Sequence, residues 1–258
     1  MENQLRSKLM KGGKPIGTFF ESGSTSIVEC LALAGLDYFI VDSEHGPFEV
    51  ESTIDFVMAA LIRGITPLAR VKDGSRASIL KMLDIGVQGL IIPDLHTVEE
   101  ARQVVEYGKY YPLGCRGVAF GRDAGWGYAS HATGSMDDYF TICNRETMLI
   151  PQCETRGFLD HIEEISSMEG IDGIFVGPYD LSVALDKPAQ FDAPEFQSAL
   201  DRVLAACRAA GKPCFIYAPN SAAAQAHLDR GFNSVAVGMD TIMCVEGFRQ
   251  LLGELRTE

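Results

Sequence analysis

Residues 148–182, MLIPQCETRGFLDHIEEISSMEGIDGIFVGPYDLS, have the pattern of a strand, a helix and a second strand. A short apolar run opens the stretch and ends at Glu154, and 157–167 then carries apolar residues at helical spacing with acidic residues between them. A second apolar strand at 173–176 leads into Gly-Pro and then Asp180. Parallel strands joined by a right-handed crossover are neighbours in a sheet. We therefore expect both carboxylates to open on the same face of that sheet.

Two carboxylates at neighbouring strand ends have two interpretations. A carboxylate in such a place is costly to desolvate alone, and a pair suggests a hard divalent cation held by oxygen, with open positions for water and substrate. Alternatively, Glu154 caps the helix that follows it and Asp180 caps a turn. The spacing alone leaves both interpretations open.

The rest of the chain repeats the same alternation of strand and helix. Strands are predicted at 15–20, 38–41, 66–69, 89–92, 148–153, 173–176, 213–216 and 233–237. Helices are predicted at 24–34, from after residue 47 to about 63, and at 76–83, 97–108, 157–167, 194–210, 221–230 and 240–252. A long loop region is predicted at about 111–145. Eight such units predict an α/β fold, a (β/α)8 TIM barrel, as a single domain over residues 1–258. An open doubly wound sheet is disfavoured because no G-x-G-x-x-G turn follows the first strand.

Composition narrows the function. The 258 residues carry 35 acidic and 22 basic side chains, a net charge of −13, which argues against nucleic acid or an anionic membrane as a partner. No apolar run reaches membrane-spanning length, and the N-terminal stretch lacks the apolar core of a signal peptide. The seven cysteines are scattered with no C-x-x-C pair, so reduced thiols and a cytoplasmic location are expected.

Polar residues are predicted where the strand ends of the barrel meet. Asp42 and His45 follow the second strand, Arg70 follows the third, and Gln152 lies two residues before Glu154 and so points the same way. A metal site, an imidazole base and a guanidinium together suit the stabilisation of negative charge on a small oxo acid. Each residue also has a structural alternative: His45 in a turn, Arg70 paired with a structural acid, and Gln152 satisfying backbone groups.

Other chemistries fit the sequence less well. A Schiff-base aldolase needs a desolvated lysine at a strand end, whereas every lysine here lies in a predicted helix or loop, and Lys72, which comes closest, is expected to be solvated. No H-E-x-x-H is present, which disfavours a zinc-protease site. Cys153 alternates away from its two polar neighbours, so a buried core thiol is expected there rather than a nucleophile.

Several motifs, in order along nearly the whole chain, resemble the HpcH/HpaI family of metal-dependent 2-oxo-acid aldolases. They are D-S-E-H-G-P at 42–47, Arg70, L-D-I-G at 83–86, R-G-V at 116–118, Q-C-E at 152–154, E-G-I-D-G-I-F at 169–175 and G-P-Y-D-L-S at 177–182. The resemblance implies a (β/α)8 barrel that reversibly cleaves a 4-hydroxy-2-oxo acid to pyruvate and an aldehyde through a metal-bound pyruvate enolate. It also implies a class II lyase and a homo-oligomer, a hexamer or dimer of trimers, with C-terminal helices exchanged between neighbours.

The resemblance further implies a role for each matching residue. Glu154 and Asp180 would ligate the divalent ion, Mg²⁺ in the first place, with Mn²⁺ or Co²⁺ as alternatives. Gln152 and the backbone N–H groups of Tyr179 and Asp180 would hold the substrate. The remaining roles fall to four residues. His45 would be the proton acceptor, Asp84 would raise the basicity of His45, and Arg70 would stabilise the enolate oxygen. Asp42 would help to orient these side chains.

Two other readings of the same residues stay open at this stage. One is a related metal-barrel lyase that acts on an acyl-CoA or a phosphorylated oxo acid. The other is a non-catalytic barrel that binds an oxo acid. The presence of a base, a guanidinium and two carboxylates together disfavours the second, because a binding protein has no need of the base.

Overall fold

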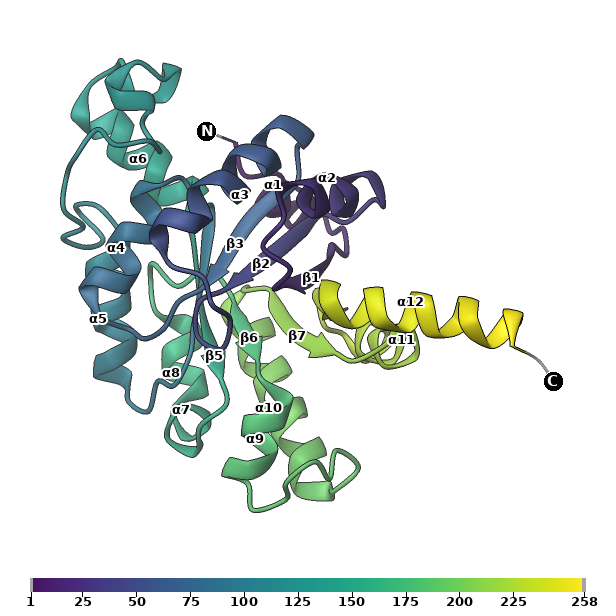
Figure 1. Cartoon of the computed structure of the whole chain (residues 1–258). Helices are drawn as coiled ribbons and strands as arrows, with labels where there is room; N and C mark the ends of the chain where they lie inside the picture. Colours follow the sequence, from purple (N-terminus) through teal and green to yellow (C-terminus); the bar gives the residue numbers. More distant parts are fainter. Residues whose placement is uncertain (1, 257–258) are drawn as a thin grey trace.

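Eight parallel strands close into a barrel in the order β1 to β8 in this computed structural model, which describes residues 2–256 (Figure 1). The strands are β1 (Ile16–Phe20), β2 (Tyr38–Asp42), β3 (Thr66–Arg70), β4 (Gly89–Ile92), β5 (Met148–Cys153), β6 (Ile174–Val176), β7 (Cys214–Ala218) and β8 (Ser234–Met239). The predicted fold class is confirmed, and each predicted strand lies within two residues of the observed one.

Helices cover the outside of the barrel. They are α1 (Gln4–Met10), α2 (Thr25–Leu33), α3 (Val50–Arg63), α4 (Arg76–Asp84), α5 (Val98–Gly108), α6 (Met136–Glu146), α7 (Arg156–Asp160), α8 (Ile162–Ser167), α9 (Pro178–Ala184), α10 (Pro194–Ala210), α11 (Ser221–Arg230) and α12 (Asp240–Leu255), with short 3-10 turns at Gly125–Gly127 and Ser130–Ala132. Several begin at a side chain that caps the first turn, such as Thr97 of α5, whose hydroxyl accepts from the backbone N–H of Glu100 at 3.2 Å.

The strands are buried on both faces, which explains why they are almost continuously apolar. One set of alternate side chains, including Ile40, Leu68 and Phe215, fills the barrel interior. The other set, including Val41 and Leu90, packs against the helices. Leu5 of α1 is fully buried with the interior set, so α1 closes the amino end of the barrel. The opposite, carboxyl end is left open.

Three helices were not predicted from the sequence, and one predicted helix is broken. α1, α6 and α9 are each 11 residues or shorter, and α6 lies within the region predicted as a loop. α6 is held by tertiary packing, because Tyr139 and Cys143 are buried against Tyr110. The helix predicted at 157–167 is two short helices, because the backbone of His161 (φ −113°, ψ 19°) departs from helical geometry.

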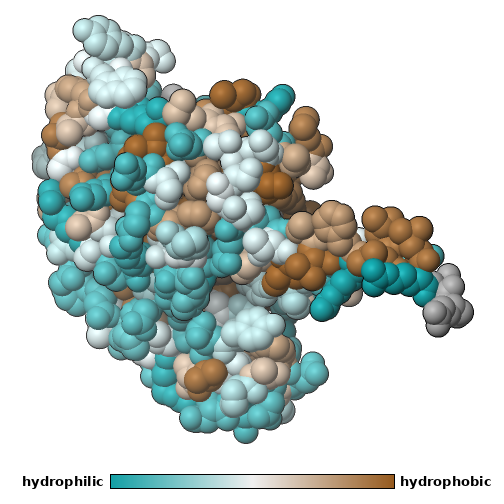
Figure 2. All heavy atoms as spheres, viewed as in Figure 1, coloured by the Kyte–Doolittle hydropathy of each residue, from teal (hydrophilic) through white to brown (hydrophobic). Residues whose placement is uncertain are grey.

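The C-terminal helix α12 leaves the barrel and extends outward (Figure 1). Of its residues only Asp240 is buried, while Val245, Phe248 and Leu251 are about half exposed or more. Figure 2 shows apolar side chains along one side of this helix. None of the helices in the described part of the chain combines the length and the apolar character needed to cross a membrane.

Candidate active site

A cavity of about 360 Å³ lies at the carboxyl end of the barrel, where the strands lead into their loops. Five residues predicted from the sequence line it: His45, Arg70, Gln152, Tyr179 and Asp180. Aromatic side chains from β1, β6 and β7 form the rest of the wall, namely Phe19, Phe175 and Tyr217. Residues more than 130 positions apart in the sequence are thus brought together by barrel closure.

Glu154 lies one residue after β5, where its carboxylate is close to Gln152 and Gly177 of the cavity wall. Its Oε1 accepts a hydrogen bond from the backbone N–H of Asp94 at 2.7 Å, and its Oε2 contacts the side-chain amide of Gln152. Thr155 caps α7, since its hydroxyl accepts from the backbone N–H of Phe158 at 3.1 Å. Glu154 is therefore not the cap of the following helix, and its carboxylate is available for another role.

The carboxylate of Glu154 is buried, and within residues 2–256 no cationic side chain is bonded to it. The residue is 6% exposed, and burial raises its pKa to about 7, although the hydrogen bonds from Asp94 and Gln152 act in the opposite direction. The neighbouring carboxylates of Glu44 and Asp180 raise the pKa further. Such a cluster of negative charge is unfavourable unless a cation compensates it.

Glycine 177 lets the two strand ends approach closely. A Cβ at this position would lie 2.7 Å from both Glu154 Oε2 and Gln152 Nε2, so any larger residue here would displace the ends of these two side chains. Gly177 is also the N-cap of α9, which carries Asp180 in its first turn. The backbone N–H groups at this helix start have no partner within the helix, so they can donate to a bound anion.

The donor set fits a hard divalent cation. Glu154 and Asp180 supply two carboxylates, and the buried Oε1 of Gln152 has no hydrogen-bond partner within the described chain. Mg²⁺ is commonly bound by one or two carboxylates and keeps its other positions for water and substrate. In residues 2–256 no group of three or more His, Cys, Asp or Glu side chains is placed to hold a metal ion. Two carboxylates and one amide oxygen would leave the other positions of such an ion to water and substrate.

Arg70 is held rigidly near the carboxylate of Glu154. Its Nε and one terminal nitrogen donate to the two oxygens of the fully buried Asp42 at 3.0 and 2.6 Å, and its other terminal nitrogen lies 3.1 Å from Glu44 Oε2. The guanidinium also lies over the ring of Phe19 at 4.9 Å. Asp42 and Arg70 are directly paired in the β2–β3 register, so sheet geometry sets this fork-to-fork contact.

His45 lies at the rim of the cavity. Its side chain is 67% exposed, its Nε2 is 4.0 Å from Glu44 Oε2, and its backbone N–H donates to Asp42 at 3.3 Å. Glu44 was not among the predicted site residues, although it lies within the quoted D-S-E-H-G-P motif. It links His45 to Arg70, and the signal that would have identified it is its place between two polar residues in that turn.

Within this chain Asp84 contacts Arg116 and not His45, so its predicted effect on the basicity of His45 stays a prediction. Asp84 is the last residue of α4, and α4 runs from the carboxyl end of β3 back to the amino end of β4. There it accepts a hydrogen bond from Arg116 at 2.7 Å, and Arg116 also binds Asp123 at 2.9 Å. Asp84 therefore lies at the far end of the barrel from His45, and the helix direction is the reason.

The excluded chemistries agree with the side-chain positions. Cys153 is fully buried in the outer core, away from the cavity. Lys72 pairs with Glu49 and its side chain is 49% exposed. One lysine is buried: Lys109 at the end of α5, whose contacts with Thr147 and Asp172 place it at the amino end of the barrel. Among the described residues no lysine lines the mouth cavity.

Residues 15–247 match the family model described as HpcH/HpaI aldolase/citrate lyase. The chain belongs to this family. It is 36% identical over 259 residues to the 2-keto-3-deoxy-L-rhamnonate aldolase of Salmonella paratyphi B, covering 100% of this chain and 94% of that relative. Among solved structures, it is similar to an HpcH/HpaI aldolase/citrate lyase family protein from Burkholderia cenocepacia J2315 (TM-score 0.90, 30% identity, 99% and 100% coverage). It is also similar to an HpcH/HpaI aldolase from Desulfitobacterium hafniense DCB-2 (TM-score 0.90, 27% identity, 98% and 97% coverage).

Membership of the HpcH/HpaI family makes the chain an aldolase, a carbon–carbon lyase. The predicted enzyme class is confirmed, and the non-catalytic reading is not needed to account for the site.

Proposed function

We propose that this HpcH/HpaI aldolase reversibly cleaves a 2-keto-3-deoxy sugar acid, a 4-hydroxy-2-oxo acid, to pyruvate and an aldehyde. The observation that carries the proposal is the buried carboxylate of Glu154, which contacts Gln152 of the cavity wall and is close enough to Asp180 for that carboxylate to raise its pKa. The full-length similarity to the Salmonella 2-keto-3-deoxy-L-rhamnonate aldolase supports the class of substrate. We assign Glu154 and Asp180 as ligands of a divalent ion, Mg²⁺ in the first place.

The protein groups around the cavity have separate tasks in this scheme. Gln152 and the backbone N–H groups of Tyr179 and Asp180 bind the oxo acid. The guanidinium of Arg70, held by Asp42, stabilises the negative charge that collects on the keto oxygen as pyruvate leaves. A bound divalent ion supplies further positive charge at the same place. Phe19 and Phe175 form an apolar wall that limits the access of water.

His45 is the proposed proton acceptor. In the cleavage direction it takes the proton from the C4 hydroxyl, the C3–C4 bond breaks, and the electron pair passes to the enolate of pyruvate. Protonation at C3 then gives pyruvate, and the carbonyl at the former C4 leaves as the aldehyde. Glu44 lies 4.0 Å from His45 and is placed to stabilise the imidazolium that forms.

Metal removal tests the proposed mechanism. EDTA is expected to abolish pyruvate release from 2-keto-3-deoxy-L-rhamnonate, and Mg²⁺ or Mn²⁺ to restore it, with pyruvate followed by a coupled dehydrogenase assay. Treatment with pyruvate and borohydride should leave every lysine unmodified by mass spectrometry. A trapped lysine adduct, or full activity after exhaustive EDTA treatment, would refute the metal-dependent mechanism.

We further propose that the chain assembles as a homo-oligomer in which α12 is exchanged between subunits. The support is the exposed apolar side of α12, which includes Val245, Phe248 and Leu252. An apolar helix surface of this kind is unfavourable in water and favours burial against a second copy.

The substitution Phe248→Glu tests this assembly. Placing a charge on the apolar side of α12 is expected to shift the protein to a smaller species, measured by light scattering coupled to size-exclusion chromatography. Arg249→Glu, one residue along the same helix, is the matched control and should keep the wild-type mass. Equal masses for the wild type and the Phe248→Glu protein would exclude α12 as the assembly contact.

A further inference from the structure

A cavity of about 540 Å³ lies at the amino end of the barrel, opposite the active-site mouth. It is formed between α1, the end of α10 and the starts of β5 and β7, and we call it the basal cavity. Three cationic side chains line it, those of Arg6, Arg208 and Lys212, whereas Asp172 is its one acidic lining residue. In a chain with a net charge of −13, this local excess of positive charge is unexpected.

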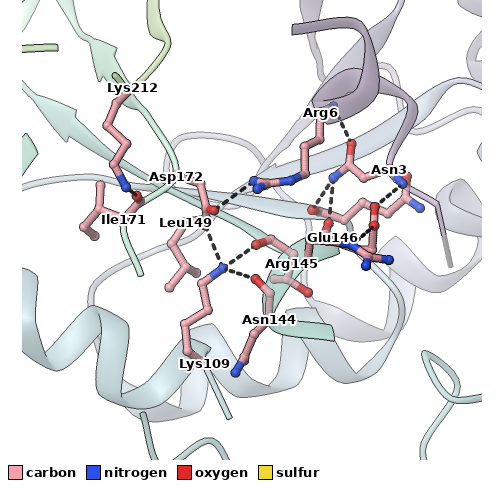
Figure 3. Close-up of polar contacts among 12 residues, drawn as sticks. Asn3, Arg6, Lys109, Asn144, Arg145, Glu146, Leu149, Ile171, Asp172 and Lys212 are labelled. Atoms are coloured by element: carbon pink, nitrogen blue, oxygen red, sulfur yellow. Dashed lines mark hydrogen bonds and ion pairs between the residues drawn. The ribbon is translucent and has the colours of Figure 1, made fainter. Parts of the chain in front are cut away.

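The charge of Asp172 is already neutralised from inside the protein. Its Oδ2 accepts hydrogen bonds from Lys109 Nζ at 2.7 Å and from the backbone N–H of Leu149 at 2.9 Å. Its Oδ1 accepts from Arg6 at 3.1 Å, and Figure 3 shows both cations converging on this one carboxylate. Asp172 therefore cannot also compensate the remaining cations of the cavity.

Lys109 adds a buried positive charge behind the cavity wall. Its side chain is 1% exposed, and it donates to the backbone carbonyls of Asn144 and Thr147 as well as to Asp172. Burial lowers its pKa, Asp172 raises it, and the nearby charges of Arg6 and Lys212 lower it. Three cations are thus close to one carboxylate, which leaves an uncompensated positive potential.

The other two lining cations have no carboxylate partner in the described chain. Lys212 donates to the backbone carbonyl of Ile171, a neutral acceptor (Figure 3). Arg208 makes no ion pair with residues 2–256, and its guanidinium lies beside the backbone of Gly231. By contrast, Arg202 on the same helix binds Glu163 at 2.8 Å. The charges of the Arg208 guanidinium and the Lys212 ammonium are therefore not neutralised by a carboxylate of the described chain and are available to an anionic ligand.

We propose that the basal cavity binds a small dianion through a phosphate group, either inorganic phosphate or a phosphorylated metabolite. Arginine and lysine together are a common phosphate-binding pair, since the guanidinium donates two parallel hydrogen bonds and the ammonium supplies a point charge. The volume of about 540 Å³ exceeds what phosphate alone needs, so a small phosphorylated molecule fits. This site is separate from the aldolase site and needs neither its metal nor its substrate.

Calorimetric titration at fixed ionic strength tests the proposal, with inorganic phosphate and glycerol 3-phosphate as the two probes. Saturable binding is expected for the wild type, and Arg208→Gln should weaken it about tenfold, since one charge-assisted contact is lost. Arg202→Gln is the matched control: it removes the same charge from the same helix and should leave the affinity unchanged. Tighter binding of glycerol 3-phosphate would identify a phosphorylated metabolite as the ligand, and tighter binding of phosphate the free ion.

An alternative role of Arg208 is a favourable interaction with the carboxyl end of α10, where it lies in the last turn. That role predicts a lower melting temperature for Arg208→Gln and no change in phosphate affinity. The proposal is overturned if neither probe binds saturably, or if Arg208→Gln and Arg202→Gln bind phosphate as tightly as the wild type.

Discussion

Replacing Glu154 by glutamine is expected to lower kcat/KM for aldol cleavage at least about 10³-fold, equivalent to about 4 kcal/mol of transition-state stabilisation. The glutamine keeps the shape of the side chain and one oxygen to accept from the backbone N–H of Asp94. It removes the negative charge that we assign to the divalent ion. Calorimetry should therefore show weaker Mg²⁺ binding in parallel with the loss of pyruvate release.

The same substitution is expected not to destabilise the metal-free protein. Burial raises the pKa of Glu154 to about 7, so above that pH the folded state carries a carboxylate that it disfavours. The unfavourable contribution develops as the pH rises from 4.5, the ordinary value of this carboxyl, to about 7, and is fully present at pH 8. In EDTA at pH 8, Glu154→Gln should melt at the wild-type temperature or above.

Asp94→Asn is the matched control for this experiment. The Asp94 side chain is 75% exposed and pairs with His96, and its positive φ of 55° is one that asparagine tolerates well. Activity and Mg²⁺ affinity should stay close to wild type. If folded Glu154→Gln retains wild-type turnover and Mg²⁺ affinity, Glu154 is not a metal ligand.

The sequence was sufficient for the barrel and for the residues that directly follow its strands. The period and spacing of apolar residues identify the strands, because each strand is short, apolar and followed by a helix. The alternation of side chains along a strand then sets the direction in which residues such as Arg70 and Gln152 point. Once the strand order is known, barrel closure places these side chains in one cavity. No further tertiary information is needed for that step.

Contacts between distant segments could not be predicted in this way. The resemblance implies that Asp84 raises the basicity of His45, whereas the direction of α4 places Asp84 at the other end of the barrel within this chain. The basal cavity gave no local signal, since Arg6 and Asp172 are 166 positions apart and Lys109 and Asp172 are 63 apart. A lysine at the end of a helix is usually solvated, and only packing reveals that Lys109 is buried.

Replacing Arg70 by alanine is expected to lower kcat about 10²–10³-fold, the loss typical of one preorganised donor to a developing oxyanion, about 2.7–4 kcal/mol. Exchange of the pyruvate methyl protons with deuterated water, followed by NMR, should slow by a similar factor, because both reactions pass through the same enolate charge. The substitution also leaves Asp42 without its ion-pair partner, because Asp42 is fully buried and bonded to Arg70 through both carboxylate oxygens. An unpaired buried carboxylate is itself destabilising.

The double substitution Asp42→Asn with Arg70→Ala separates these two effects. It removes the unpaired charge of the buried Asp42 carboxylate and leaves the cavity without the Arg70 guanidinium. The double variant should therefore be more stable to heat than Arg70→Ala but should not regain activity. Recovery of wild-type turnover in the double variant would mean that Arg70 serves only to neutralise Asp42. Loss of activity in both variants, with exchange slowed in both, places the function of Arg70 at the enolate oxygen, because that charge is the one feature that both variants leave uncompensated.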